Sequence, residues 1–466
     1  MWNAETPSDG DVSRDHQLST PLPAAFGVAV VVMVATIVGS LAFRTNETGT
    51  YVMLLVLVGL IGWVVRKLPM AVDRSWLPTY IVAGWVAKLL ASGGRYWALQ
   101  VLYHGVGDAS GYHGHGVRNA PVWRSFHIPQ LGTGTHFVDA AASFLYIPYI
   151  PTKLGGFFMF ATLAFFGQVL FYAAFRRAFP NSSLKLYAAL IFFFPNIVYW
   201  PSSIGKEALM IPFISIAAYG AVRLFADYRP KWVMVLALGI LGSGLIRSHI
   251  ALLLILSVAG AMFMGKRPAL KSARIRRLTS MVGIAAVLAG AAGYAIQDFG
   301  IDISSGISAS LVEDELDPIF AGVEDQTGKG GSAVEGAGIR SPLDIPEAVL
   351  RVVFQPLPWD ANSIQTLVSA IFEGSLLLGL FIWRTSSIIR HFRRRWRQPY
   401  ALFSLIYTAG FVFGHSPVLN LGIMARQRSQ MIPFVLVLLV ALGDRTGTGS
   451  EIADPETVTV PALSRF

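Results

Sequence analysis

Apolar runs of about twenty residues recur along the whole chain, a pattern typical of helices that cross a membrane. Hydrophobic residues make up 54% of the 466 positions and charged residues only 14%, whereas a soluble domain carries about a quarter charged residues. We therefore expect an all-α fold, a polytopic transmembrane helix bundle in a lipid bilayer. The sequence predicts about twelve spans, at 22–43, 51–65, 76–102, 155–175, 186–200, 204–222, 232–246, 250–265, 278–296, 362–383, 399–415 and 430–443.

The net charge of +10 has a topological explanation. In a polytopic membrane protein, Lys and Arg collect in the cytoplasmic loops, so we expect no nucleic-acid partner. The chain contains no cysteine, which excludes disulfides, thiolate metal sites and thiol nucleophiles. Residues 1–21 lack the basic start of a cleavable signal, and the apolar run after them is too long for one. We interpret 22–43 as an uncleaved first span.

Basic loops alternate with loops that are poor in Lys and Arg. This positive-inside pattern predicts a multi-pass protein of the bacterial plasma membrane, with a transmembrane domain at 22–443 and cytoplasmic tails at 1–21 and 444–466. The external side then holds two long loops, 104–154 and 297–361. The basic loops contain Arg66, Lys67 and Arg74, then Arg176, Arg177 and Lys185, then Arg223, Arg229 and Lys231, and finally the segments 265–277 and 390–397.

The two external loops differ in character. Within 104–154, the segment 138–150 is apolar enough to lie in the membrane interface or to re-enter the membrane. The loop 297–361 carries twelve Asp or Glu residues against three basic ones, and we expect its glycine-rich centre, 324–338, to be mobile.

The stretch "GDASGYHGHG" at 107–116 lies just beyond the third span. Asp108 is a candidate general base if desolvation raises its pKa, and His113 is a second candidate catalytic residue. Asp108, His113 and His115 could instead ligate a divalent cation, the one cofactor left open. The alternative is a glycine-rich loop with solvated histidines.

The stretch "FPNIVYWPSSIGKEALM" at 194–210 has two prolines near the outer end of an apolar span. Proline breaks the hydrogen-bond ladder, and broken backbone at membrane depth is tolerated mainly where it lines a cavity. Ser202 or Ser203 could cap the next helix, which places Lys206 in its first turn. A helix N-terminus with a lysine suits a phosphate, and the adjacent Glu207 is a further candidate catalytic carboxylate. The alternative is a simple turn with a solvated Lys206–Glu207 pair.

Two further external turns carry cations, against the general charge rule. Arginine forks bind phosphate oxygens bidentately, and the alternative is snorkelling to lipid headgroups. These candidate phosphate-binding residues are Arg247, His249, Arg426 and Arg428.

Three charged residues fall inside predicted spans: Lys88, Arg95 and Glu373. Intramembrane charges are costly and face a cavity or a partner, so a Lys88–Glu373 pair is one arrangement to test. Before the tenth span, Trp359 is either an interfacial anchor or a platform for a sugar ring, with Asp360 bonding the sugar hydroxyls.

The segments "GDASGYH", "FFPNIVYWPSSIGKEALM", "FQPLPWD" and "NLGIMARQR" resemble polytopic proteins of actinobacterial surface-polysaccharide clusters, which are similar to type-C glycosyltransferases and oligosaccharide polymerases. The resemblance covers roughly 80–440. In type-C transferases an acidic residue of an early external loop acts as base or metal partner, and Asp108 matches it. In the polymerases, external arginines and a histidine hold the diphosphate without metal. Here the acidic loop follows the third span, without an Asp-x-Asp pair, so both branches stay open.

Three functions remain in competition. The first is transfer of sugar from a polyprenyl-(di)phosphate donor to a glycan acceptor on the external face, by a glycosyltransferase or polysaccharide polymerase. The second is a transporter or flippase of lipid-linked oligosaccharides, for which Lys88 and Glu373 argue. The third is a structural or sensor protein that binds a partner through the acidic loop 297–361.

Overall fold

The computed structural model describes residues 48–68, 74–129, 131–148, 151–227, 229–265, 318, 320–328, 333, 336, 338–361 and 364–443. These residues form helices joined by turns, with no strand among them beyond an isolated bridge between Ala333 and Asn420. The helices are α2 (Thr48–Lys67), α4 (Leu77–Trp97), η2 (Ala98–Leu102), α5 (Asp108–Arg124), α6 (Thr135–Leu145), α7 (Lys153–Ala178), α8 (Leu184–Phe193), α9 (Pro195–Tyr199), α10 (Lys206–Asp227), α11 (Pro230–Ile246), α12 (Ser248–Met264), η3 (Pro342–Asp344), α15 (Ile345–Val349), η4 (Leu350–Phe354), η5 (Pro358–Asp360), α16 (Ile364–Ser369), η6 (Ala370–Ser375), α17 (Leu376–Arg395), α18 (Pro399–His415), α19 (Leu421–Arg428) and α20 (Ile432–Leu442).

The all-α prediction is confirmed for the described residues, whereas the predicted number of twelve membrane spans is not confirmed. Among the described residues, four helices are long and apolar enough to cross a bilayer, namely α2, α7, α10 and the stretch Thr366–Arg393. The bent pair α19 and α20 would make a fifth. Helices α8, α11 and α12 are apolar but shorter than eighteen residues. The predicted spans 22–43 and 278–296, both tails and the first part of the loop 297–361, residues 297–317, lie outside the described residues.

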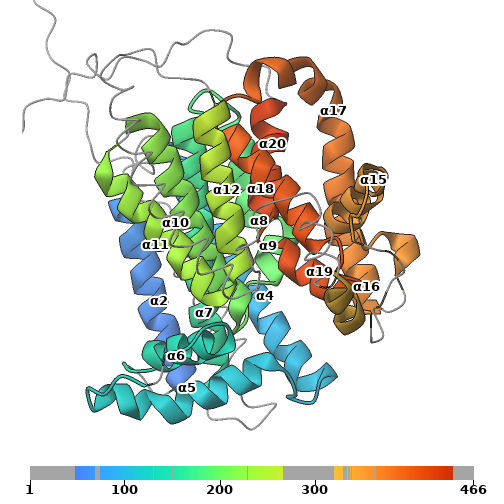
Figure 1. The fold of residues 1–466 in the computed structure, drawn as a ribbon. Coiled ribbons are helices and arrows are strands. Elements are labelled where there is room, and N and C mark those ends of the chain that lie inside the picture. Colours follow the sequence, from blue (N-terminus) through green and yellow to red (C-terminus); the bar gives the residue numbers. More distant parts are fainter. Residues whose placement is uncertain are drawn as a thin grey trace, which may run out of the picture.

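The long helices stand side by side, and α5 and α6 lie across one end of this bundle (Figure 1). Helix α10 packs mainly on α11 and α7, and α12 packs on α18. Gly239 permits the α10–α11 contact, because a Cβ at this position would collide with the backbone of Ala217. The close approach of α10 and α11 matters for function, since the N-terminus of α10 and the C-terminus of α11 both contribute to the candidate site.

Apolar side chains cover both the inside and the outside of the bundle. The centre is built from fully buried aromatic residues such as Phe165, Phe171 and Tyr187. On the outward faces, Leu55 of α2 is 63% exposed, Met234 of α11 73% and Ile382 of α17 65%. Exposed apolar surface of this extent marks contact with another apolar phase, which fits helices that face lipid.

The stretch 107–116 is not the loop that we expected. Helix α5 begins at Asp108 and includes three glycines of this stretch. Helical propensity alone would not form it, since glycine costs about 1 kcal/mol relative to alanine. Packing on α6 compensates: a Cβ at Gly116 would lie 2.9 Å from Tyr146 and 3.1 Å from Ala142. Helix α6 has one apolar face and includes residues 138–145 of the segment 138–150, whose interfacial or re-entrant position stays a prediction.

Basic residues gather at the end of the bundle opposite α5 and α6. Arg177 pairs with Asp227 at 3.7 Å, joining the C-terminal ends of α7 and α10. Arg397 donates to the Met264 carbonyl at the end of α12 (3.3 Å), and Arg395 donates to the Ala441 carbonyl at the end of α20 (2.8 Å). The alternation of basic loops in the sequence therefore corresponds to two chemically different ends.

Candidate functional site

A cluster of charged side chains lies where α10, α11, α12, α19 and α5 meet. Glu207 accepts from Arg247 Nη2 at 2.8 Å and lies 2.9 Å from Arg426 Nε. Arg426 Nη1 also donates to Asp108 Oδ2 at 3.2 Å. Residues from four distant parts of the sequence are thus linked in one chain of ion pairs, which we call the arginine cluster. It comprises Asp108, Lys206, Glu207, Arg247 and Arg426, with Arg95 beside it.

Helix ends position these side chains. Lys206 and Glu207 open α10, and Arg247 connects α11 to α12 in extended backbone (φ −149°). Arg426 lies on α19, whose start is capped by Asn420, because its side-chain oxygen accepts from the N–H groups of Gly422 and Ile423. A capped helix holds its first turn in place, so the guanidinium of Arg426 is carried by a defined element.

Positive charge exceeds negative charge in this cluster. Lys206 interacts electrostatically with Asp108, Glu207, Arg247 and Arg426, and Arg95 interacts with Glu207 and Arg426. Four cations against two carboxylates leave a net charge of +2. Arg247 Nη1 has no hydrogen-bond partner among the described residues, although its side chain is only 9% exposed. An incompletely compensated group of guanidinium and ammonium donors is suited to a phosphate or diphosphate.

The two carboxylates of the cluster differ in exposure. The Glu207 side chain is 6% exposed and contacts two arginines, whereas the Asp108 side chain is 63% exposed and contacts one. Glu207 therefore resembles a positioning residue that holds both guanidinium groups. Asp108 is the carboxylate within reach of a ligand. Because the Asp108 side chain is exposed, its position beside the cations is what supports a role as a general base.

Tyr112 adds an unpredicted member to this region. It lies one turn after Asp108 on α5, hydrogen-bonds to Thr135, and interacts with Asp108, Glu207 and Arg426. Burial raises its pKa, so it stays a neutral hydroxyl at physiological pH. The spacing of Asp108 and Tyr112, four residues apart, would have predicted a shared face had 107–116 been interpreted as a helix.

The three charged residues that fall inside predicted spans hold the broken segment around α9 in place. Lys88 is fully buried and donates to the Ile197 carbonyl at 2.6 Å. Glu373 accepts from Asn196 at 2.6 Å and from Trp200 at 2.8 Å. The Arg95 guanidinium lies over the Tyr199 and Trp200 rings, 5.2 and 5.1 Å from their centres.

Lys88 and Glu373 thus bind the same segment, 196–200, from different sides instead of pairing with each other. The backbone break itself follows the prediction, since Pro195 begins α9 directly after α8 ends at Phe193. Neither Ser202 nor Ser203 caps α10, because the helix begins at Lys206 and Gly205 is the residue before it; the Ser202 hydroxyl donates to the Val198 carbonyl. Lys206 nevertheless begins that helix, so its predicted place in the first turn is confirmed.

Other predicted site residues make their contacts elsewhere. Arg428 is 1% exposed and donates to the Val352 carbonyl at 3.1 Å, near Glu373 and away from Asp108. His249 packs edge-on against His415, with 5.6 Å between ring centres. Arg428 therefore bonds outside the arginine cluster, whereas His415, the ring partner of His249, interacts electrostatically with Arg247 of the cluster.

The histidines of α5 point in different directions. His113 hydrogen-bonds the buried Tyr146 hydroxyl at 3.0 Å, and burial, followed by the charge of Lys153, lowers its pKa to about 4. His113 is therefore neutral at physiological pH and acts in packing. His115 lies further along the helix and lines a separate pocket. No group of three metal-ligating side chains is found in the part of the chain that the structure describes.

The sugar-binding candidates Trp359 and Asp360 lie in the short helix η5. Asp360 accepts from the Leu357 backbone N–H at 2.8 Å, so one of its oxygens stabilises this turn. The Trp359 side chain is 76% exposed, which agrees with an interfacial anchor. Both residues are on a different element from the arginine cluster, and no contact joins them to it among the described residues.

Comparison of the chain with protein-family models, with curated proteins and with solved structures gives no match.

Proposed function

We propose that the chain is a membrane glycosyltransferase or polysaccharide polymerase, which transfers sugar from a polyprenyl-(di)phosphate donor at the external end of the bundle. The single observation that carries this proposal is the arginine cluster, in which residues separated by more than 300 positions meet around Glu207 with an excess of positive charge. A lipid-linked donor suits this location, because its phosphate can bind the cations while its apolar tail lies along the exposed faces of the helices.

The proposed reaction is a displacement at the anomeric carbon of the donor sugar. The acceptor hydroxyl oxygen forms the new bond to that carbon, and the bond from the carbon to the phosphate oxygen breaks. Asp108 takes the hydroxyl proton. Lys206, Arg247 and Arg426 stabilise the negative charge that develops on the leaving polyprenyl (di)phosphate. Glu207 keeps Arg247 and Arg426 in place for this task.

Transport is the weaker alternative. It was motivated by the intramembrane charges Lys88 and Glu373, and both have local partners that stabilise segment 196–200. Their burial is thus accounted for by the fold.

Transfer of sugar from polyprenyl-linked donors to acceptor glycan, assayed in membranes that contain the full chain, tests the proposal. We expect Asp108→Asn to reduce the transfer rate by about 10²–10⁴-fold, as for loss of a general base. Arg426→Gln should reduce it about as strongly, because a charge-assisted contact to the leaving group is lost. Arg340→Gln is the matched control: Arg340 pairs with Glu324 at the surface (3.2 Å) outside the cluster. The control should transfer sugar at the wild-type rate. Wild-type rates in both Asp108→Asn and Arg426→Gln would reject the proposal.

A further inference from the structure

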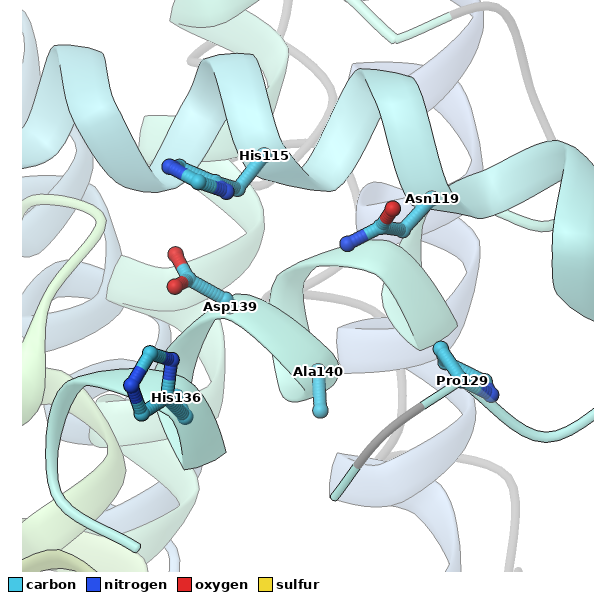
Figure 2. A pocket seen from close by; sticks show the side chains of 6 residues that line it. All are labelled: His115, Asn119, Pro129, His136, Asp139 and Ala140. Atoms are coloured by element: carbon cyan, nitrogen blue, oxygen red, sulfur yellow. The ribbon is translucent and has the colours of Figure 1, made fainter. Parts of the chain in front are cut away.

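A polar pocket lies between α5 and α6 (Figure 2), and none of its lining residues belongs to the arginine cluster. Its volume is about 280 Å³, below the roughly 300–1,000 Å³ of pockets for drug-sized ligands, so it suits one small unit of a larger molecule. Helix α5 supplies two of the side chains and α6 supplies three, while Pro129 comes from the segment between the two helices. The lining residues are His115, Asn119, Pro129, His136, Asp139 and Ala140.

Asp139 is the unusual member of this pocket. Its side chain is buried, with 8% of the residue exposed, yet its Oδ1 atom has no hydrogen-bond partner among the described residues. Figure 2 shows the carboxylate directed into the space between His115 and His136. A buried carboxylate without donors is costly, so a water, an ion or a ligand is expected to supply the missing partner.

Burial raises the pKa of Asp139, while the nearby His115, His136 and Arg118 act in the opposite direction. The ionised form therefore depends on the cationic surroundings and on any donor that a ligand brings. The pocket itself, with its unpartnered oxygen, is the observation that points to a ligand.

The chemistry of the lining selects the class of ligand. A carboxylate only accepts hydrogen bonds, an asparagine amide both donates and accepts, and each histidine ring offers one or both roles. A ligand that satisfies all of them must donate and accept at neighbouring atoms, as the hydroxyl groups of a sugar ring do. The ring of Pro129 adds an apolar wall.

The pocket lies next to the arginine cluster along α5. Asp108, Tyr112, His115 and Asn119 follow one another at spacings of four, three and four residues, which places them on one face of the helix. At about 1.5 Å per residue, His115 lies roughly 10 Å along the axis from Asp108. At the other side, Gly134 lies near Lys206, since a Cβ at Gly134 would be 4.0 Å from Lys206 Nζ, and His136 follows Gly134 by two residues.

We propose that this pocket binds the hydroxyl groups of one sugar unit of the glycan, with Asp139 accepting from one hydroxyl and His115, Asn119 and His136 bonding to its neighbours. The proposal deepens the proposed function and rests on it, since the sugar unit would belong to a glycan whose reacting end lies at Asp108 and the cations.

Saturation-transfer NMR on the detergent-purified full chain tests this proposal directly. The probes are the methyl glycosides of glucose, galactose, mannose, rhamnose and N-acetylglucosamine, each added alone. We expect at least one glycoside to bind, and we expect Asp139→Asn and His115→Ala each to weaken its binding tenfold or more. His127→Ala is the matched control, because His127 is an exposed histidine of the same segment whose ring contacts Ser125 outside the pocket.

The folded state of the variants is checked by their thermal unfolding midpoints. Asp139→Asn removes a buried charge that lacks donors, so its midpoint should equal or exceed that of the wild type. Loss of binding with an unchanged midpoint would then report the ligand contact alone.

The outcomes also separate this proposal from the proposed function. Glycoside binding that needs Asp139, in a chain that shows no sugar transfer, would support the pocket and reject the transferase. Sugar transfer that is unaffected by Asp139→Asn, together with no glycoside binding, would support the transferase and reject the sugar-binding pocket. Binding of Zn²⁺ at this pocket without binding of any glycoside would overturn the assignment of its ligand.

Discussion

At the scale of single residues, the arginine cluster places two carboxylates in opposite situations. Glu207 is enclosed by two guanidinium groups at 2.8 and 2.9 Å, and Asp108 is mostly exposed with one contact at 3.2 Å. Removing one member of a buried ion pair leaves the other charge uncompensated, whereas an exposed pair contributes little to stability. The two carboxylates should therefore differ in what their loss affects.

We expect Glu207→Gln to lower the free energy of unfolding by about 3–5 kcal/mol, because Arg247 and Arg426 lose their common counter-charge in a buried position. Asp108→Asn should change it by less than about 1 kcal/mol. Chemical unfolding of the two purified variants in detergent measures both values. Equal stability of the two variants would contradict the positioning role assigned to Glu207.

The half-buried His113 predicts a dependence of stability on pH. Its pKa is lowered to about 4, against about 6.5 in an unfolded chain, so the unfolded state binds the proton more readily between these values. The contribution of His113 to the free energy of unfolding is fully present above pH 6.5, and it is lost as the pH decreases from 6.5 toward 4. We expect a loss of about 1–2 kcal/mol, allowing for the solvent that still reaches the ring. Thermal unfolding of wild type and His113→Gln across this range measures it. An identical acid slope in the two proteins would argue against His113 as the cause.

Topology alone predicted that Asp108, Lys206, Arg247 and Arg426 would share one end of the bundle, because Lys and Arg in the other loops define the opposite end. It could not predict which arginine of α19 joins the cluster. Arg426 and Arg428 are two residues apart and so face different sides of a helix. Which of the two arginines faces the cluster depends on how α19 packs. The sequence of α19 does not indicate this, because its apolar residues do not form one clear face. The same limit applies to Lys88 and Glu373, whose partners are backbone and side-chain groups of the broken segment around α9.

At the scale of elements, α5 is the part of the fold that differed most from expectation. Its glycines suggested a loop, yet the helix forms because Gly116 allows α5 to approach Ala142 and Tyr146 of α6 closely. Tertiary packing therefore outweighs local propensity here. Once α5 is helical, the face that carries Asp108, Tyr112 and His115 follows from the sequence, and so does the polar pocket between α5 and α6.

Two glycine substitutions in α5 separate propensity from packing. Gly111 has open space around it, so Gly111→Ala should raise the free energy of unfolding by about 0.5–1 kcal/mol. Gly116→Ala puts a Cβ at 2.9 Å from the Tyr146 ring, and overpacking of this kind costs about 1–3 kcal/mol. Chemical unfolding of the two variants measures both changes in the free energy of unfolding. A Gly116→Ala variant more stable than wild type would refute the close α5–α6 contact.

At the scale of the whole molecule, the two ends of the bundle are proposed to lie on opposite sides of the membrane. The chain has no cysteine, so a single introduced cysteine reports its own side without background. Ser125 lies at the end of α5, and Asn181 lies in the turn after α7 at the opposite end; both are exposed. In intact cells, a membrane-impermeant maleimide should label Ser125→Cys and not Asn181→Cys. Labelling with the reverse preference would place the arginine cluster on the cytoplasmic side.

The central claim is that the arginine cluster binds the phosphate end of a lipid-linked sugar. Its most direct test is calorimetric titration of the purified full chain with farnesyl diphosphate, a short isoprenoid diphosphate. Each charge-assisted hydrogen bond contributes about 1.5–3 kcal/mol, so Arg247→Gln and Arg426→Gln should each weaken binding by roughly 10–100-fold, while Arg340→Gln should leave it unchanged. Equal affinities of wild type, Arg247→Gln and Arg426→Gln, or no binding by the wild-type chain, would contradict the claim.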